Sequence, residues 1–251
     1  MSKRTIVSAL AALVLAAPAL HAQAQAAPQT YLLATYYECD YASEGTADIM
    51  MQRLAPVLQK HVTAGHISGY AMSAHVMGGA WRRLVTMTGQ RDALLDVWSG
   101  LDAELQAADP VAYDAFNNTC GSHQDYLWAQ VANGPAPTAT VAAANTFRHS
   151  TYFFCNQATE ETVDSLVIKT VGPEIQKHVA MGHLGSWGWL RHDNGGTVRR
   201  VLTFTGPTVK ALFQMRQAVF EGIGEANANQ LFGGACGNHF EYVWSDVPLT
   251  P

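Results

Sequence analysis

The chain has 251 residues, 48% hydrophobic and 14% charged, a balance typical of folded globular proteins and not of disordered or fibrous ones. Its 15 Lys and Arg against 20 Asp and Glu give a formal net charge of −5, which argues against nucleic acid or an anionic membrane as a partner. The sequence contains no G-x-S-x-G, P-loop, H-E-x-x-H or dinucleotide-binding motif, so hydrolase, nucleotide-binding and zinc-protease functions have no support.

The first 26 residues are predicted to be a secretory signal peptide. Lys3 and Arg4 precede an apolar run over residues 6–20, and Ala-Gln-Ala sequences follow as cleavage sites. The run is too short, and too soon interrupted by Pro18, for a membrane anchor. Removing residues 1–26 lowers Lys and Arg from 15 to 13 against 20 acidic residues, so the mature charge is −7. We therefore expect an exported protein, periplasmic or secreted, with no membrane attachment after cleavage.

Four segments of the first half recur in the second, which predicts an internal duplication. The matching pairs are TYYECD at 35 with TYFFCN at 151, PVLQKHV at 56 with PEIQKHV at 173, GGAWRRLVTMTG at 78 with GGTVRRVLTFTG at 195, and CGSHQDYLW at 120 with CGNHFEYVW at 236. The offset is 116 residues at the two outer pairs and 117 at the two inner ones. We predict repeat 1 over residues 30–131, a Pro/Ala/Thr-rich linker over 132–146 and repeat 2 over 147–247.

The predicted elements of the first repeat, in chain order, alternate between strands and helices. Pro56 lies inside the segment with helical periodicity in the first repeat, and Pro173 lies at the matching position of the second. A proline inside a helix predicts that the helix kinks or restarts there. Gly65 and Gly182 suit the left-handed position that ends a helix, and Gly78 with Gly79 suits a hairpin turn. The elements are a strand over 30–39, a helix over 46–62, strands over 67–76 and 80–88, a helix over 91–107 and a strand over 123–131.

The order βαββαβ, written twice, predicts an α+β fold with two tandem ferredoxin-like repeats. In such a sheet the first and last strands are antiparallel neighbours, so the four cysteines are expected to pair within each repeat, Cys39 with Cys120 and Cys155 with Cys236. Export supports disulfide formation. A Cys/His metal site remains the alternative, but the compact C-x-x-C pairs typical of such sites are absent.

With tandem βαββαβ units, the chain resembles the dimeric α+β-barrel superfamily. The resemblance implies that the two halves pair within the chain as sheets that close a barrel, with the helices outside; any higher oligomer is left open. Members include cofactor-independent monooxygenases, small-ring isomerases, haem-degrading enzymes, chlorite dismutases and dye-decolourising peroxidases. The G-x-x-D-G signature of the last branch is absent from this sequence, and the fold alone does not choose among the others.

Eight of the ten histidines occupy matching positions in the two repeats. His61 and His178 lie near a helix end, where interaction with the helix dipole is the simpler explanation and ligation of haem, as in the haem branches, is the alternative. A five-residue spacing and an intervening glycine argue against a metal shared with His66 or His183. We therefore expect no metal and no cofactor, with haem kept as the alternative.

Strand alternation provides the candidate site residues. We expect the side of the third strand opposite its apolar face to look into the barrel and to bind a small ligand through Arg82 and Thr86, and through Arg199 and Thr203. By the same alternation, His123 with Asp125 and His239 with Glu241 are the catalytic candidates, because a His/carboxylate pair can move a proton. The alternative is that these arginines and His/carboxylate pairs lie at a solvated rim. Trp187 and Trp189, which replace Tyr70 and Met72 of the first repeat, suggest a larger apolar pocket in the second, although core packing explains them equally well.

The sequence thus supports three functions. The first is an exported barrel that binds a small apolar or aromatic molecule, with cofactor-independent monooxygenase or isomerase activity as its catalytic form. The second is a haem-binding protein of the same fold. The third is a non-catalytic structural or interaction module.

Overall fold

The computed structural model describes residues 29–249, and the predicted signal peptide over 1–26 lies outside the described residues. In the first half the elements are β1 Tyr31–Glu38, α1 Glu44–Thr63, β2 Gly69–Met77, β3 Arg83–Gly89, α2 Arg91–Ala108, α3 Pro110–Thr119 and β4 Ser122–Asn133. After α4 Ala139–Ala144, the second half has β5 Phe147–Phe154, α5 Glu160–Leu166, α6 Gly172–Ala180, β6 Trp187–Gly195, β7 Arg200–Gly206, α7 Val209–Ile223, α8 Glu225–Asn229 and β8 Asn238–Val247.

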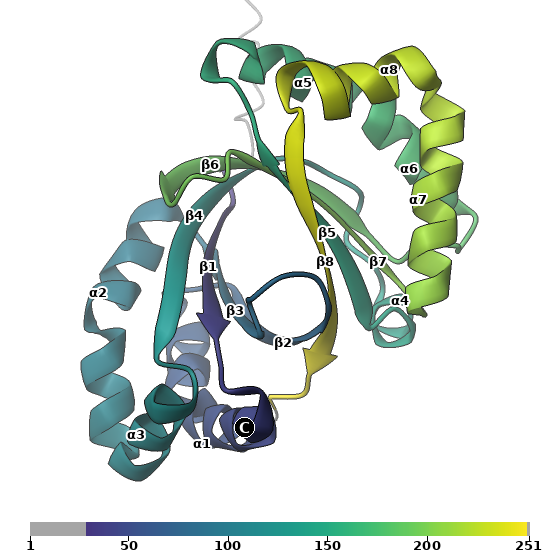
Figure 1. Cartoon of the computed structure of the whole chain (residues 1–251). Coiled ribbons are helices and arrows are strands. Elements are labelled where there is room, and N and C mark those ends of the chain that lie inside the picture. Colours follow the sequence, from purple (N-terminus) through teal and green to yellow (C-terminus); the bar gives the residue numbers. More distant parts are fainter. Residues whose placement is uncertain (1–28, 250–251) are drawn as a thin grey trace, which may run out of the picture.

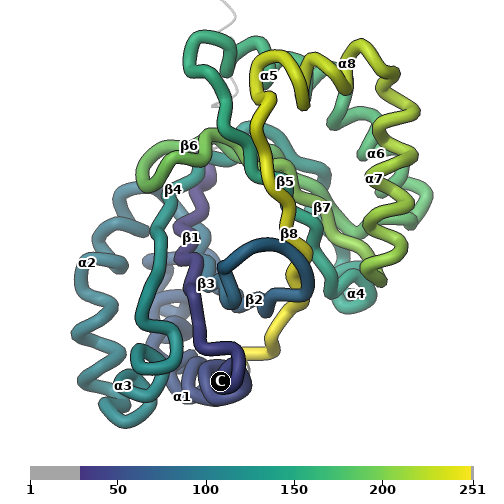
Figure 2. The backbone as a smooth tube through the Cα atoms, viewed as in Figure 1, coloured from purple at the N-terminus to yellow at the C-terminus, as the bar shows by residue number. Residues whose placement is uncertain are grey.

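The eight strands form one closed antiparallel barrel in the order β1-β3-β2-β8-β5-β7-β6-β4. Within each half the first strand lies between the third and the last, and the halves join where β2 pairs with β8 and β4 pairs with β6. Helices α1 to α3 cover the outside of one half and α5 to α8 the outside of the other (Figure 1; Figure 2). Within residues 29–249, none of the helices combines the length and apolar character that crossing a bilayer needs.

The predicted elements are present with small shifts of their ends, and three helices, α3, α4 and α8, were not predicted. The chain restarts as α3 at Pro110, where the Asp109 carboxylate accepts a hydrogen bond from the Ala112 amide and so caps the new helix. The stretch predicted as a linker contains the short helix α4, capped in the same way by Thr138. A six-residue helix rich in alanine carries too little periodicity to be recognised in a sequence.

Both predicted glycine helix ends are confirmed, and they have the same geometry. Gly65 has φ +75° and Gly182 has φ +76°. In each case the glycine amide donates to the carbonyl three residues back, and the following histidine amide donates to the carbonyl five residues back, from His66 to His61 and from His183 to His178. This pair of bonds is the Schellman motif, which satisfies carbonyls that the end of the helix leaves free.

The two prolines in the first long helices have different consequences. Helix α1 continues through Pro56 without interruption. In the second half, a π-helical turn at Val167–Val171 separates α5 from α6, which has Pro173 in its first turn. The offset between matching residues is 116 at Asp48/Asp164 and 117 at Pro56/Pro173, so one extra residue enters between them. The π turn lies in that interval and absorbs the extra residue.

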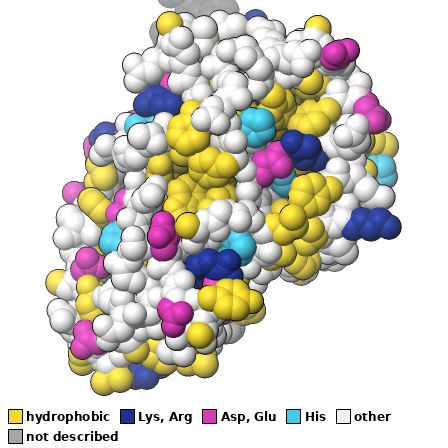
Figure 3. Space-filling model, in the orientation of Figure 1, with side chains coloured by type: hydrophobic (Ala, Val, Ile, Leu, Met, Phe, Trp, Pro, Cys, Tyr) yellow, Lys and Arg dark blue, Asp and Glu magenta, His cyan; other side chains and the backbone are white. Residues whose placement is uncertain are grey.

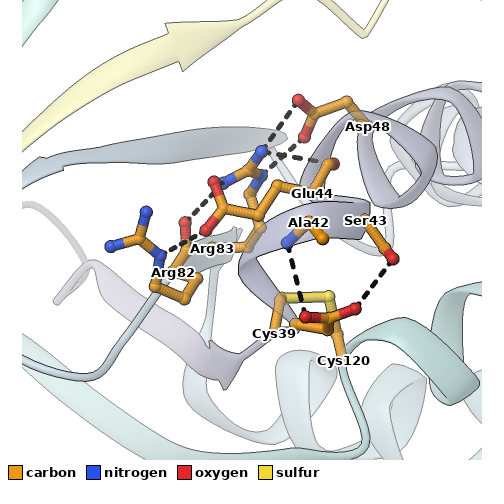
Figure 4. The surroundings of a disulfide bond; sticks show 9 residues. Cys39, Ala42, Ser43, Glu44, Asp48, Arg82, Arg83 and Cys120 are labelled. Atoms are coloured by element: carbon orange, nitrogen blue, oxygen red, sulfur yellow. Dashed lines mark hydrogen bonds and ion pairs between the residues drawn. A yellow bond between two sulfur atoms is a disulfide. The ribbon is translucent and has the colours of Figure 1, made fainter.

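A buried arginine ties the first helix of each half to the third strand. Arg83 is 3% exposed and makes a two-pronged contact with Asp48 at 2.6 and 2.9 Å (Figure 4). Arg200 is 1% exposed and contacts Asp164 in the same way at 2.8 and 2.9 Å. A buried guanidinium is stable only with such complete pairing, so these contacts fix the register of helix on sheet.

The β-hairpin turn of each half lies against the other half. A Cβ on Gly78, which has φ +134°, would come within 2.5 Å of the Tyr242 ring, and one on Gly195, which has φ +115°, within 2.2 Å of the Asp125 carbonyl. Both positions therefore require glycine for conformation and for space. The Tyr242 hydroxyl also accepts a hydrogen bond from the Trp81 amide at 3.1 Å. The turns thus lock the two halves together.

The predicted cysteine pairing is confirmed. Disulfides join Cys39 to Cys120 and Cys155 to Cys236, each closing a separation of 81 residues. In each half the bond links the end of the first strand to the start of the last, beside the beginning of the first helix (Figure 4).

Replacing both Cys155 and Cys236 by serine is expected to lower the free energy of unfolding by about 4 kcal/mol, because the unfolded chain regains the entropy of an open loop of roughly 80 residues. Urea unfolding followed by tryptophan fluorescence measures the change. The Cys39→Ser, Cys120→Ser pair is the matched control and should lose a similar amount, since its loop has the same length. Equal midpoints for the wild type and both variants would contradict the expectation.

Candidate functional site

Aromatic side chains fill one end of the barrel. Trp81 stacks between Tyr36 and Tyr242, with ring centroids 4.2 and 5.2 Å apart. Further along, Trp128 stacks on Tyr126 at 4.9 Å, and Trp244 stacks on Tyr242 at 4.9 Å. These rings form one buried cluster inside the barrel. On the face shown in Figure 3, hydrophobic side chains gather over the middle of the barrel, between β4 and β8.

The opposite end of the barrel contains a cavity of about 470 Å³. It lies where β1, β2, β5 and β6 begin and where β3 and β7 end. The cavity exists because many of the side chains around it are small, and several of these carry hydroxyl groups. Its polar lining includes Thr86, Thr88, Ser150, Thr203 and Thr205 with the phenols of Tyr36 and Tyr152, and its apolar lining includes Leu32, Leu84, Leu190 and Val201.

Arg148 is the only charged residue lining this cavity within residues 29–249. Its guanidinium is 3.9 Å from the Asp246 carboxylate, the limit of an ion pair. Arg148 and Asp246 also line an adjoining recess of about 440 Å³. Burial raises the pKa of Asp246, although the charge of Arg148 opposes the shift. Sequence reasoning missed Arg148 because the matching residue of the first half is Leu32, and the arginine candidates were chosen among positions that carry arginine in both halves.

Two phenols form the floor of the cavity. Burial raises the pKa of Tyr36 well above its usual value, and the neighbouring Tyr152 adds to the shift. Burial likewise raises the pKa of Tyr152, to about 12. Both phenols are therefore protonated at neutral pH and donate hydrogen bonds. Behind them, the indole N–H groups of Trp128 and Trp244 are buried without a hydrogen-bond partner in the described part of the chain.

Among the predicted ligand-binding residues, Thr86 and Thr203 do line the cavity, at matching positions of β3 and β7. The two predicted arginines do not. Arg82 forms an ion pair with Glu44 and contacts His75 at 2.7 Å, and Arg199 pairs with Glu160 at 2.6 Å and contacts His192 at 2.8 Å. They lie beside the hairpin turns and the starts of the first helices (Figure 4 shows Arg82), so their charges are already matched.

The predicted catalytic pairs face the helices and not the barrel interior, which corrects the expected orientation of β4 and β8. His123 is 3.4 Å from Asp125 but half-exposed, and Asp125 accepts a hydrogen bond from Thr35 at 2.6 Å. His239 packs against Phe232. The expectation failed because it assumed that the apolar face of each strand lies under the helices. Here the aromatic residues of β4 and β8 fill the barrel, so both faces of the sheet are buried.

The two tryptophans that suggested a larger pocket belong mainly to the core between sheet and helices. Trp189 is fully buried there, and its indole N–H donates to Asp164 at 2.7 Å. Trp187 borders the cavity, but its indole N–H donates to Gln176 of α6 at 3.0 Å. Their hydrogen bonds therefore stabilise the position of the helices.

Glu241 lies in a partly buried network that, among the described residues, only the second half contains. It is 2.6 Å from Arg216 of α7 and 3.5 Å from His149, which is fully buried and stacks on Phe204 with ring centroids 4.9 Å apart. Burial by itself would raise the pKa of Glu241, but the hydrogen bonds and charges of His149 and Arg216 outweigh it and lower this pKa to about 2. Glu241 therefore stays ionised and holds α7 to the barrel.

No family model matches the chain, and no curated protein does. Solved structures do match. An anthrone oxidase-like protein aligns with a TM-score of 0.59 at 12% identity over 89% of this chain and 93% of its own. A proposed monooxygenase from Lactobacillus acidophilus NCFM gives 0.58 at 6% over 88% and 95%, and a chlorite dismutase from Candidatus Nitrospira defluvii gives 0.55 at 8% over 88% and 92%.

The chain has the dimeric α+β-barrel fold. At these identities the likeness shows the fold alone, and the activities of the matched proteins remain theirs. The expected dimeric α+β-barrel fold is thereby confirmed, with the eight-stranded antiparallel barrel at its centre.

The low pKa of Glu241 predicts a loss of stability in acid. Because this pKa is lower in the folded than in the unfolded chain, the stabilisation is complete above about pH 4.5 and is lost as the pH falls towards 2. Its upper limit is about 3 kcal/mol. We expect the difference in free energy of unfolding between the wild type and Glu241→Gln to shrink over this range in urea titrations. A difference independent of pH would contradict the ionised network.

Proposed function

We propose that the protein is an exported barrel that binds one small, largely apolar or aromatic molecule carrying an anionic oxygen. In this proposal residues 30–131 and 147–247 are two ferredoxin-like repeats, joined by residues 132–146, that pair within one chain. The observation that carries the proposal is Arg148, which among residues 29–249 is the single cation in a cavity otherwise lined by apolar and uncharged polar side chains. Such a lining is typical of a small-molecule site.

The lining indicates how the ligand lies. Leu32, Leu84 and Val201 contribute apolar surface for a ring system. The hydroxyls of Thr86 and Thr203, on matching strands, offer hydrogen bonds on two sides of the cavity. Arg148 attracts a carboxylate, sulfonate or phenolate near the mouth, where Asp246 neutralises it only weakly at 3.9 Å. The ligand is thus held by burial of its rings and oriented by its charge.

The same site supports cofactor-independent oxygenase or isomerase chemistry as the catalytic form of the proposal. Asp246 is the carboxylate of the adjoining recess, 3.9 Å from the cation that would hold the resulting anion, and burial raises its pKa. The Tyr36 and Tyr152 phenols, kept protonated by burial, would donate hydrogen bonds to an enolate or phenolate oxygen. Asp246 replaces His123 and His239 as the candidate base.

Haem is the second candidate, because solved structures of this fold include a chlorite dismutase. The donor set of the cavity does not favour it. No histidine, cysteine or methionine lines the cavity within the described residues, and the raised pKa of Tyr36 and Tyr152 disfavours phenolate ligation. His61 and His178 lie on the outer helices, paired with His66 and His183. We therefore derive no step through haem.

Binding of the fluorescent aromatic sulfonate 1-anilinonaphthalene-8-sulfonate tests the proposal. We expect Arg148→Leu to weaken its affinity about tenfold or more, because a charge-assisted contact of about 1.5–3 kcal/mol is lost. The neutral dye N-phenyl-1-naphthylamine should bind both proteins alike. Arg191→Leu, at an exposed arginine of β6, is the matched control and should leave both affinities unchanged.

If the wild type and Arg148→Leu bind the sulfonate with equal affinity, the proposal that Arg148 binds an anion is wrong. Failure of both dyes to bind the wild type would instead favour the non-catalytic structural module. Haem binding would be supported if protein purified after haem-supplemented expression showed a Soret band. That band should then be lost in a His61→Gln, His178→Gln variant that still folds.

A further inference from the structure

The repeated histidines at the helix ends form two matching pairs of facing imidazoles. In the first half His61 Nδ1 lies 3.1 Å from His66 Nδ1, and in the second half His178 Nδ1 lies 3.4 Å from His183 Nδ1. The sequence argued against a shared metal because a glycine separates the members of each pair. That same glycine, in the left-handed conformation, turns the chain back and brings the rings together. The spacing argument therefore does not hold in the folded chain.

The Schellman motif normally places a hydrophobic contact where these rings meet. Two imidazoles facing each other through Nδ1 at both helix ends need another explanation. One shared proton between the rings is the simplest, since one Nδ1–H can donate to the other Nδ1. A metal ion bound by both nitrogens is the other.

A carboxylate favours the metal in the first half. Glu104 of α2 lies 3.2 Å from His61 Nε2, so this nitrogen donates to the carboxylate and His61 Nδ1 carries the free lone pair. A carboxylate on the far nitrogen is the usual support of a metal-binding histidine. Lys60 lies 3.4 Å from the same carboxylate and helps to hold it in place. In the second half the corresponding distance, from His178 to Glu174, is 4.0 Å.

The distances fit a transition metal. With metal–nitrogen bonds of about 2.0–2.1 Å, two ligands of one ion lie about 2.9 Å apart at a right angle and about 3.4 Å apart in a tetrahedron. The observed 3.1 and 3.4 Å fall in this range. The first pair opens into a cleft of about 290 Å³ that Asp96 also lines. No group of three or more His, Cys, Asp and Glu side chains in residues 29–249 is arranged as a metal site, so water would complete the coordination.

We propose that each helix end is an exchangeable two-histidine site for a divalent transition-metal ion, and that the first-half site, His61 with His66, is the tighter of the two. Imidazole nitrogens bind Cu²⁺ most strongly among the divalent first-row ions, and they also suit Zn²⁺ and Ni²⁺. Both sites lie on the outside of the barrel, apart from the cavity and Arg148, so the proposal is independent of the proposed function.

Titration of the mature protein with Cu²⁺, followed by electron paramagnetic resonance, tests the proposal. In the wild type we expect two bound Cu²⁺ ions per chain, each with the hyperfine splitting that nitrogen ligands cause. The His66→Gln variant should bind one such ion, and the double variant His66→Gln, His183→Gln should bind no nitrogen-coordinated ion. Both replaced side chains are exposed, so the variants should fold, which circular dichroism checks. If the double variant keeps the nitrogen-coordinated signal of the wild type, the pairs share a proton and the proposal is wrong.

The Glu104→Gln variant tests whether the first-half site binds the metal more tightly than the second-half site. As a positioning residue, Glu104 should support the first site without contacting the metal, and its loss should weaken that site 10–100-fold while leaving the second unchanged. A competition titration with Zn²⁺ reads both affinities in one experiment. Equal affinities at the two sites of the wild type, or no effect of Glu104→Gln, would overturn the role of the carboxylate.

Discussion

Closure of the sheet is the constraint on which the rest of this structure depends. Each half alone would leave two open strand edges, and the pairs β2–β8 and β4–β6 remove all four. Closure also encloses the inner face of every strand, so side chains on both faces are buried. The outer face packs under the helices and is held by Arg83 and Arg200, and the inner face must fill a space that neither half could fill alone.

The inner face is filled unevenly, and the cavity follows from this. Towards the hairpin turns the barrel receives Trp81 and stacked tyrosines, which fill it completely. Towards the other end it receives Thr, Ser, Ala and Gly, whose side chains are too small to meet across the barrel. An unfilled apolar space would cost stability, but this cavity is lined by hydroxyls and, within residues 29–249, by one cation, which is the kind of lining that the proposed ligand requires.

Much of the fold could be predicted because it depends on local signals. Alternation, helix-ending glycines and matched cysteines lead directly to the strand order, to the Schellman turns and to the disulfides. The site could be predicted only in part. Thr86 and Thr203 line the cavity as expected, and their role in ligand binding stays a prediction. His123 and Glu241 were assigned to the wrong face, because hydrophobicity does not distinguish two faces that are both buried. Arg148 left no signal, since it matches a leucine in the other half.

Residues that match between the two halves and residues that differ between them therefore have different roles. Residues that match, such as Arg83 with Arg200 or Gly65 with Gly182, perform the same structural task twice. Residues that differ break the symmetry of the barrel: Trp81 against Val198 decides which half fills the hairpin end, and Arg148 against Leu32 gives the cavity a single charged side. A symmetric barrel would offer a ligand two equivalent orientations. For the proposed ligand, one arginine removes that equivalence, because the orientation that places the anion beside Leu32 leaves the anion unpaired in a partly dry cavity.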